Sequence, residues 1–329
     1  MFPEPKDRRD IQETASLFQQ SRALLSAFEL KLFTAIDERP LSAEEIAERN
    51  GVSTAGAERL LNALAAMNFV RKEDDKFSNV PAASEYLVEG KPNYLGGLIH
   101  TSHTWDNWSH LTEATRLGAR PEGAIDQRDD EWTKPFIRAM HDRGVSRARE
   151  IADKLDLTGV TRILDVGGGS GCFAAEFLRR APEARAVVFD LPNVLPVTRE
   201  FVERDENRDR VELRAGDYRT DDFGEGHDFV FLSAVVHINS YESNRDLIQR
   251  CAEATVSGGR VVVSDYVMNE RKTEPAVGAL FSLNMLVATE EGDVFNFEEM
   301  REWMTDAGLE DVRLIEIDGV TALVEGRKP

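Results

Sequence analysis

Four glycines and one acid stand together near the middle of the chain, in an order that can hold a nucleoside-bearing cofactor. The segment 161–171 reads TRILDVGGGSG and is followed by the amphipathic stretch CFAAEFLRR, which predicts a strand, a glycine turn and a helix. Glycine lets the backbone pass close under a ligand, where a side chain would collide with it. Asp165, Gly167 and Gly169 fit the pattern D-x-G-x-G-x-G without a shift, and an acid ahead of the glycines suits a cationic amino-acid group. The dinucleotide pattern G-x-G-x-x-G/A fits only from Gly169, so this turn alone leaves both cofactor classes open.

Acids also follow the next two predicted strands. Asp190 comes after the apolar run 186–189, about twenty residues beyond the glycine turn, where a carboxylate can take both ribose hydroxyls. Asp217 follows the run 211–214 and can accept from an adenine amino group while its neighbour covers the ring. Any one of these acids could simply cap the helix after its strand. Acids at three consecutive strand ends are better explained by one shared ligand.

Five motifs in order extend this pattern. They read DVGGGSG, FDLP, GDY, LSAVVH and CAEATVSGGRVVVSDYV. Over nearly its whole length the chain resembles the S-adenosylmethionine-dependent O-methyltransferases, in the branch with plant caffeate and isoflavone O-methyltransferases, acetylserotonin O-methyltransferase and bacterial tailoring enzymes. The resemblance implies S-adenosylmethionine as cofactor, S-adenosylhomocysteine as product, and no metal. The cofactor-binding residues expected here are Asp165, Gly167, Gly169, Asp190, Leu191, Gly216, Asp217, Tyr218 and Ser233.

A histidine, His237, follows the fourth predicted strand, 228–232, and matches the catalytic position of the family. A phenol has a pKa of about 10. A neutral imidazole could remove its proton, and general-base help of this kind typically contributes about 10²- to 10⁴-fold. Asp265 follows the predicted strand 260–264 and matches an acid that flanks this histidine in the family. A carboxylate there would fix the tautomer of the imidazole and stabilise the imidazolium.

The surroundings of this histidine depart from the family. The run 238–241 reads Ile-Asn-Ser-Tyr where plant relatives read Asp-Trp-Ser-Asp, and Ser233 stands where they often carry a cofactor-contacting lysine. A second flanking acid would fall at Val294, although acids stand nearby at 290, 291 and 293. Gly144 stands where several relatives carry a serine that reaches the cofactor carboxylate. Methyl transfer to carbon or nitrogen therefore stays open beside transfer to oxygen.

Apolar and aromatic side chains are expected to contact the methyl acceptor. They come from the helical segments 94–118, 135–151 and 278–296, and in the last of these Phe281, Asn284 and Met285 would present a mostly apolar slot with one amide. Such a slot suits a planar aromatic or polyketide-like molecule, although ordinary helix packing explains most of these residues equally well. Trp108 is expected to pack in the protein core. The expected acceptor-binding residues are Trp105, Met140, Phe281, Asn284 and Met285.

The elements that must position these residues alternate between strand and helix from about residue 154 onward. This alternation predicts an α/β fold with a doubly wound, mostly parallel sheet, the Rossmann-like core of class I methyltransferases, with ligands at the carboxyl ends of the strands. Asp318-Gly319 joins the runs 312–317 and 321–325 and is a strong hairpin signal. An antiparallel final strand is typical of methyltransferase sheets and argues against a dehydrogenase.

The first part of the chain predicts an α-helical winged-helix domain. Helical spacing runs from 11 to 36, a serine-capped helix opens at 41–47, another helix covers 54–67, and a two-stranded wing lies within 69–77. The helix that would enter DNA offers one arginine and few base-reading side chains, and the wing tip is acidic, so DNA binding is disfavoured. In the resembled family this domain forms the homodimer and closes one wall of the partner's substrate pocket. That role is implied here.

Length and composition agree with this organisation. A chain of 329 residues exceeds one ordinary domain. The predicted boundaries are 1–95 for the winged-helix dimerisation domain, 96–153 for linking helices of the substrate pocket, and 154–329 for the methyltransferase domain. The net charge of −20 disfavours nucleic-acid and anionic-membrane partners. Two cysteines, no membrane-length apolar run and no signal-peptide core predict a cytoplasmic protein.

These patterns together predict a homodimeric S-adenosylmethionine-dependent O-methyltransferase that acts on a small hydroxylated molecule. A C- or N-methyltransferase of the same fold stays open, and so does a non-catalytic cofactor-binding regulator that acts through its winged helix.

Overall fold

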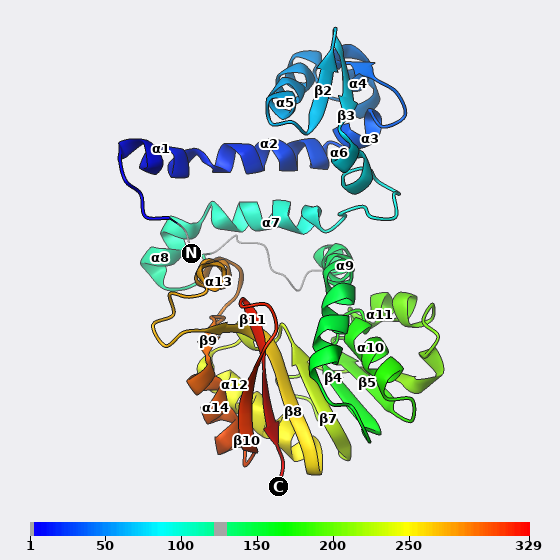
Figure 1. Ribbon diagram of the computed structural model, residues 1–329, viewed down its shortest axis with the longest axis vertical. Coiled ribbons are helices and arrows are strands. Elements are labelled where there is room, and N and C mark those ends of the chain that lie inside the picture. Colours follow the sequence, from blue (N-terminus) through cyan, green and yellow to red (C-terminus); the bar gives the residue numbers. More distant parts are fainter. Residues whose placement is uncertain (1–2, 122–129) are drawn as a thin grey trace. The chain divides into compact units, whose positions relative to one another are not determined.

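The computed structural model describes residues 3–121 and 130–329, which form two compact units divided between His103 and Thr104 (Figure 1). Helix α7, Leu98–Trp108, contains this boundary. Each unit has a hydrophobic core of its own. Within the described residues, no helix combines the length and the apolar character that crossing a bilayer requires.

The N-terminal unit is a small helical domain with a three-stranded sheet. Its helices are α1 Arg8–Ser16, α2 Phe18–Glu29, α3 Leu32–Ala35, α4 Ala43–Asn50, α5 Thr54–Ala66 and α6 Pro81–Tyr86. Its strands are β1 Leu41–Ser42, β2 Val70–Glu73 and β3 Lys76–Asn79, in the order β1-β3-β2. The helical stretch expected over 11–36 is divided into α1, α2 and α3. The break between α2 and α3 falls at Lys31, which adopts a left-handed conformation, with φ of 54°, that no helix continues through.

The helix cap and the wing of this unit occur where the sequence predicts them. Ser42 caps α4 through a capping box with Glu45, and Gly51 ends that helix in a left-handed conformation. Strands β2 and β3 pair antiparallel around Asp74 and form the wing. Phe77, from the wing, packs with the apolar faces of the helices in the core of the unit.

The C-terminal unit is an α/β domain. Its further helices are α8 Leu111–Leu117, α9 Asp130–Lys154, α10 Cys172–Arg180, α11 Leu195–Val202, α12 Tyr241–Ala254, α13 Ala276–Ala288 and α14 Phe297–Asp306. Its strands are β4 Arg162–Val166, β5 Arg185–Asp190, β6 Val211–Ala215, β7 His227–Ser233, β8 Thr255–Met268, β9 Phe295–Asn296, β10 Glu310–Glu316 and β11 Thr321–Arg327. The main strand order is β10-β11-β8-β7-β4-β5-β6.

The central strands of this sheet are parallel. Strands β6, β5, β4, β7 and β8 pair parallel to one another, whereas β11 pairs antiparallel with both β8 and β10. The hairpin expected at Asp318-Gly319 and the antiparallel last strand are therefore confirmed. Because parallel strands end at the same edge of a sheet, this edge collects the residues that follow β4, β5, β6 and β7.

Alternating side chains of the strands enter two cores, one on each face of the sheet. Leu164 packs with Trp303 of α14 and with α12 on one face, whereas Ile163, its neighbour in β4, packs with Phe177 of α10 on the other. Phe177 meets Phe229 edge-on, with ring centroids 5.4 Å apart. Because successive side chains of a strand point to opposite faces, an uninterrupted apolar strand is buried from both sides.

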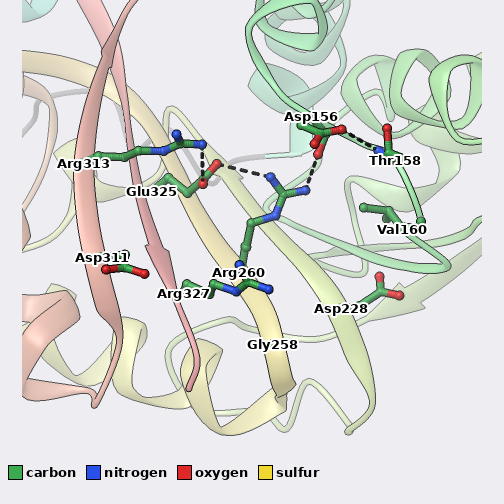
Figure 2. A pocket seen from close by; sticks show the side chains of 11 residues that line it. Asp156, Thr158, Val160, Asp228, Gly258, Arg260, Asp311, Arg313, Glu325 and Arg327 are labelled. Carbon is green, nitrogen blue, oxygen red and sulfur yellow. Dashed lines mark hydrogen bonds and ion pairs between the residues drawn. The ribbon is translucent and has the colours of Figure 1, made fainter.

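The opposite edge of the sheet carries a charged groove of about 550 Å³, shown in Figure 2. Glu325 of β11 is buried there between two guanidinium groups, with Arg313 at 2.9 Å and Arg260 at 3.5 Å. Asp228 accepts hydrogen bonds from the backbone N–H groups of Thr161 and Arg162, at 2.8 and 2.9 Å. Ion pairs and charge-assisted hydrogen bonds at this edge thus connect neighbouring strands of the sheet.

Candidate active site

The glycine turn after β4 is tied to β5 by its own backbone. Gly167 donates to the carbonyl of Phe189 at 2.8 Å, and Gly169 donates to Oδ2 of Asp190 at 2.7 Å. Gly167 and Gly169 have φ values of 66° and 55°, in the left-handed region that favours glycine. A Cβ on Gly168 would lie 2.9 Å from the carboxyl group of Asp165. The turn therefore leaves a bare backbone surface.

Asp165 is a buried carboxyl group with one oxygen in use. Its Oδ2 accepts from the backbone N–H of Ala174 at 3.3 Å, and its Oδ1 has no hydrogen-bond partner among the described residues. Burial raises the pKa of Asp165 to about 7. A cationic group placed here would gain a hydrogen bond and lower that pKa, so this acid fits the ammonium of an amino-acid moiety.

Asp190 ends β5, and both of its oxygens accept backbone hydrogen bonds. The donors are the N–H groups of Gly169 and Leu191, each at 2.7 Å. Burial raises its pKa to about 6. Each carboxylate oxygen has two lone pairs, so Asp190 could still accept from the two hydroxyls of a ribose.

The residues after β6 make contacts of their own. Asp217 is paired with Arg219, with an N–O distance of 2.7 Å, so an adenine amino group would share this carboxylate with a guanidinium. The hydroxyl of Tyr218 donates to Oδ1 of Asn239 at 3.0 Å. Burial raises the pKa of Tyr218 to about 12, which keeps this phenol neutral. A side chain at Gly216 would collide with the ring of Phe189.

His237 and Asp265 are brought together by the register of two parallel strands. Ser233, the last residue of β7, pairs with Ser264 of β8, so Asp265 comes one position beyond the point where β7 ends. Nδ1 of His237 lies 2.8 Å from Oδ1 and 3.0 Å from Oδ2 of Asp265. Both residues are buried, with 9% and 5% of their surface exposed. The carboxylate can only accept, so Nδ1 carries the proton and the lone pair is on Nε2.

Two aromatic rings cover one side of this pair. The ring of Phe281, in α13, meets His237 edge-on, with centroids 4.8 Å apart. Phe281 in turn stacks on Tyr266 at 4.4 Å. Gly292 lies against the backbone, since a Cβ there would be 2.5 Å from the carbonyl oxygen of His237. These contacts hold the imidazole in one orientation.

The acids near the position of the second flanking acid are engaged elsewhere. Glu291 accepts from Ser243 at 2.7 Å, Asp293 accepts from Ser282 at 2.5 Å, and Val294 is buried. Among the described residues, Asp265 is the one carboxylate with a hydrogen bond to His237.

The expected acceptor-binding residues have different degrees of burial. Phe281 lies beside His237, and Asn284 accepts a hydrogen bond from Nε1 of Trp108 at 3.0 Å. Trp105 and Met140 are half-buried on α7 and α9. Met285 is 3% exposed, so it has little surface to present to an acceptor.

At Gly144, where several relatives carry a serine, the space for a side chain is occupied by Cys172. A Cβ on Gly144 of α9 would lie 2.6 Å from Sγ of Cys172, the first residue of α10. Beside it, a ring nitrogen of His141 lies 2.9 Å from Oγ of Ser170 in the glycine turn, and the ring stacks on Phe201 at 3.8 Å. Helix α9 is thus joined to the glycine turn by a contact that the sequence analysis did not include.

Other neighbours of the site were also missed by sequence reasoning. Tyr266 follows Asp265 directly and could have been found from that adjacency. Asn239 lies two residues after His237 and accepts from Tyr218, which no local pattern indicates. Ala234 has a φ of 57°, an uncommon value for a residue with a side chain, and it redirects the chain between β7 and His237.

Comparison with known proteins defines the class of this fold and site. Residues 115–310 match the model of the O-methyltransferase domain, and residues 12–89 match the O-methyltransferase dimerisation domain. The chain belongs to this family and is an S-adenosylmethionine-dependent methyltransferase.

Named relatives lie within this family. The chain is similar to the tetracenomycin polyketide synthesis 8-O-methyl transferase of Streptomyces glaucescens, with 34% identity over 97% of this chain and 96% of the relative. It is also similar to an N,N-dimethyltransferase of Streptomyces rimosus, with 29% identity over 91% and 90% of the two chains. Among solved structures, the Serratia methyl transferase PigF with S-adenosylhomocysteine has a TM-score of 0.91 and 25% identity, over 98% of this chain and 100% of that one.

Proposed function

We propose that this protein transfers a methyl group to a hydroxyl of a small aromatic or polyketide-like molecule, with His237 as the general base. The observation that carries the proposal is the buried His237–Asp265 pair, 2.8 Å apart, at the sheet edge that also bears the glycine turn. The S. glaucescens relative is named for methyl transfer to oxygen in polyketide synthesis, which supports this acceptor. The N,N-dimethyltransferase relative makes nitrogen the alternative that the experiment must exclude.

The residues of the turn fit S-adenosylmethionine, which supplies an electrophilic sulfonium methyl group when bound. Asp165 would hold its ammonium, because Oδ1 of this buried acid has no hydrogen-bond partner in the part of the chain that the structure describes. Asp190 would hold the ribose, and Tyr218 and Asp217 would adjoin the adenine. The other residues proposed to contact the cofactor are Gly167, Gly169, Leu191, Gly216 and Ser233.

His237 would act through Nε2. Nδ1 faces Asp265, so Nε2 is the nitrogen that can take the proton of an acceptor hydroxyl as its oxygen becomes a nucleophile. Asp265 would stabilise the imidazolium that results. Phe281, edge-on to the imidazole, would face the acceptor.

The remaining acceptor contacts are proposed from the same unit. Trp105, Met140 and Asn284 would contribute the exposed part of the slot, and Met285 would support it. A mostly apolar slot with one amide suits a flat molecule with few polar groups.

The N-terminal domain is proposed to form a homodimer, because residues 12–89 match a dimerisation domain. We propose domain boundaries of 1–95, 96–153 and 154–329 for the dimerisation, linking and methyltransferase parts. Light scattering of the full chain would give twice the chain mass, and a monomer mass at micromolar concentration would contradict the proposed dimer.

Replacement of the base tests the function directly. Purified protein is titrated with S-adenosylmethionine and, separately, NAD, and hydroxylated aromatic molecules are screened for formation of S-adenosylhomocysteine. His237→Gln is expected to lower kcat by about 10²- to 10⁴-fold and to leave the Kd of S-adenosylmethionine unchanged.

The matched control is His227→Gln, which changes a histidine at the start of β7 that contacts the carbonyl of Phe223. Its turnover should equal that of the wild type. Full activity of His237→Gln on the preferred acceptor would contradict a hydroxyl acceptor and favour transfer to nitrogen or carbon. Absence of methyl transfer in protein that binds S-adenosylmethionine would favour a non-catalytic regulator.

A further inference from the structure

Trp108 makes a polar contact that core packing does not require. Trp108 ends α7, and Asn284 lies within α13. Nε1 of Trp108 donates to Oδ1 of Asn284 at 3.0 Å, and both residues are half-buried. The hydrogen bond therefore joins two helices at a point that keeps some exposed surface.

This contact determines which end of the Asn284 amide group faces Trp108. An indole N–H can only donate, so the atom of Asn284 that faces it must be the carbonyl oxygen. The NH₂ group of Asn284 then points away from Trp108, and it has no hydrogen-bond partner among the residues that the structure describes.

Phe281 contacts His237 and lies on the same helix as Asn284, so it links the position of the Asn284 NH₂ group to that of the proposed base. Phe281 contacts His237 edge-on at 4.8 Å, and Asn284 follows it by three residues on α13. Residues three apart on a helix lie on the same face, about 5–6 Å apart at Cβ. A flat molecule that lies along this face, with its reacting hydroxyl at His237, would meet Asn284 at a second point.

We propose that Trp108 is a positioning residue that makes Asn284 a fixed hydrogen-bond donor, and that the methyl acceptor carries a ketone or quinone carbonyl which accepts from it. The inference rests on the function proposed above. A carbonyl oxygen can only accept, so it matches an NH₂ group that cannot rotate to offer its oxygen. An acceptor without this carbonyl would leave the NH₂ group unpaired, which lowers kcat/KM by about tenfold for one neutral hydrogen bond.

Paired acceptors test the proposal. Fused-ring phenols that bear a ketone, such as 7-hydroxy-1-tetralone, are each compared with the counterpart that lacks it, here 5,6,7,8-tetrahydro-2-naphthol. The wild type should prefer the ketone by about tenfold in kcat/KM. Asn284→Leu should remove the preference. Asn284→Asp, which presents only acceptor oxygens, should reverse it.

Trp108→Phe isolates the positioning role. It keeps a ring of similar shape but leaves the amide free to rotate, so the ketone preference should fall to about threefold or less, with an unchanged Kd for S-adenosylmethionine. Trp303→Phe is the matched control, since Nε1 of Trp303 is buried without a hydrogen-bond partner among the described residues, and the ring packs from α14 into the core that α12 also covers. Its preference should stay at the wild-type value.

Two results would overturn the inference while the proposed function stands. One is equal kcat/KM of the wild type for the ketones and their counterparts. The other is a wild-type ketone preference in Trp108→Phe when Asn284→Leu has lost it. Failure of the proposed function looks different, because the wild type would then methylate none of the hydroxyl acceptors.

Discussion

Replacement of Asp265 by asparagine should disable the base while leaving the fold intact. Oδ1 of Asp265 accepts from both Nδ1 of His237 and the backbone N–H of Tyr266, each at 2.8 Å. The amide oxygen of an asparagine can keep both of these bonds. Its NH₂ group would then occupy the place of Oδ2, which lies 3.0 Å from Nδ1, and would face the N–H of the imidazole as a second donor. Either the imidazole changes tautomer and loses the lone pair on Nε2, or the imidazolium loses its charged partner.

The size of the effect follows from these contacts. A hydrogen bond to a charged group contributes about 1.5–3 kcal/mol, which corresponds to about 10- to 150-fold in rate. A complete change of tautomer would remove the full general-base contribution of about 10²- to 10⁴-fold. We therefore expect Asp265→Asn to lower kcat by at least about tenfold and at most about 10⁴-fold, with little change in KM.

The assay is the rate of S-adenosylhomocysteine formation at saturating S-adenosylmethionine, from pH 6 to pH 10. The defect should shrink as the pH approaches about 10, the pKa of a phenol, because an ionised acceptor needs no base. Asp228→Asn is the matched control, since it makes the same carboxylate-to-amide change at the opposite sheet edge and should alter Tm but not kcat. A kcat for Asp265→Asn within twofold of the wild type at pH 7, or a defect that stays constant up to pH 10, would refute this account.

The other predictions concern the cofactor turn. Burial raises the pKa values of Asp165 and Asp190 to about 7 and about 6, so both acids bind more protons in the folded than in the unfolded state over roughly pH 4 to 7. The Tm of the cofactor-free protein should accordingly fall as the pH rises through this range, and Asp165→Asn should flatten the slope. The Kd of S-adenosylmethionine, measured calorimetrically, should weaken from pH 8 to pH 5.5, because a cation prefers the ionised acid; a pH-independent Kd would contradict the role of Asp165. Gly144→Ser should destabilise the fold by about 1–3 kcal/mol in denaturant titrations, because its Cβ meets Cys172, and Cys172→Ala in the same chain should restore most of the loss.

The strands that precede the proposed cofactor-binding residues could be predicted because each is a short apolar run that ends at a glycine or an acid. Strand β4 and helix α10 follow this pattern, and so does the end of β5 at Asp190. Strand β8 is longer than the expected 260–264. It begins at Thr255, because Gly258, which indicates a turn when read locally, pairs with Lys328 beyond the end of β11. No neighbour in sequence supplies that partner.

The pairing of His237 with Asp265 could be predicted for a similar reason. His237 follows β7, and Asp265 lies within the neighbouring parallel strand β8, one position beyond the pairing of Ser233 with Ser264, so strand register brings the two residues together. The contact between Trp108 and Asn284 could not be predicted, because it joins helices 176 residues apart whose relative placement depends on side-chain packing. The sequence analysis expected Trp108 to pack in the core, whereas in the structure its indole N–H donates to Asn284.

The position of β11 has a consequence for how the chain is made. This strand is synthesised after β10, yet in the sheet it lies between β10 and β8 and hydrogen-bonds to both. While β11 is still inside the ribosome, β10 has no strand to pair with and the edge of β8 is open, although the glycine turn and the base have long emerged. The nascent chain thus carries every residue of the candidate site, and the parallel strands β4 to β8 that position them, while the outer edge of β8 is still unpaired. A chain interrupted between Asp318 and Thr321 would lack β11 and would leave the edge of β8 unpaired and prone to aggregation.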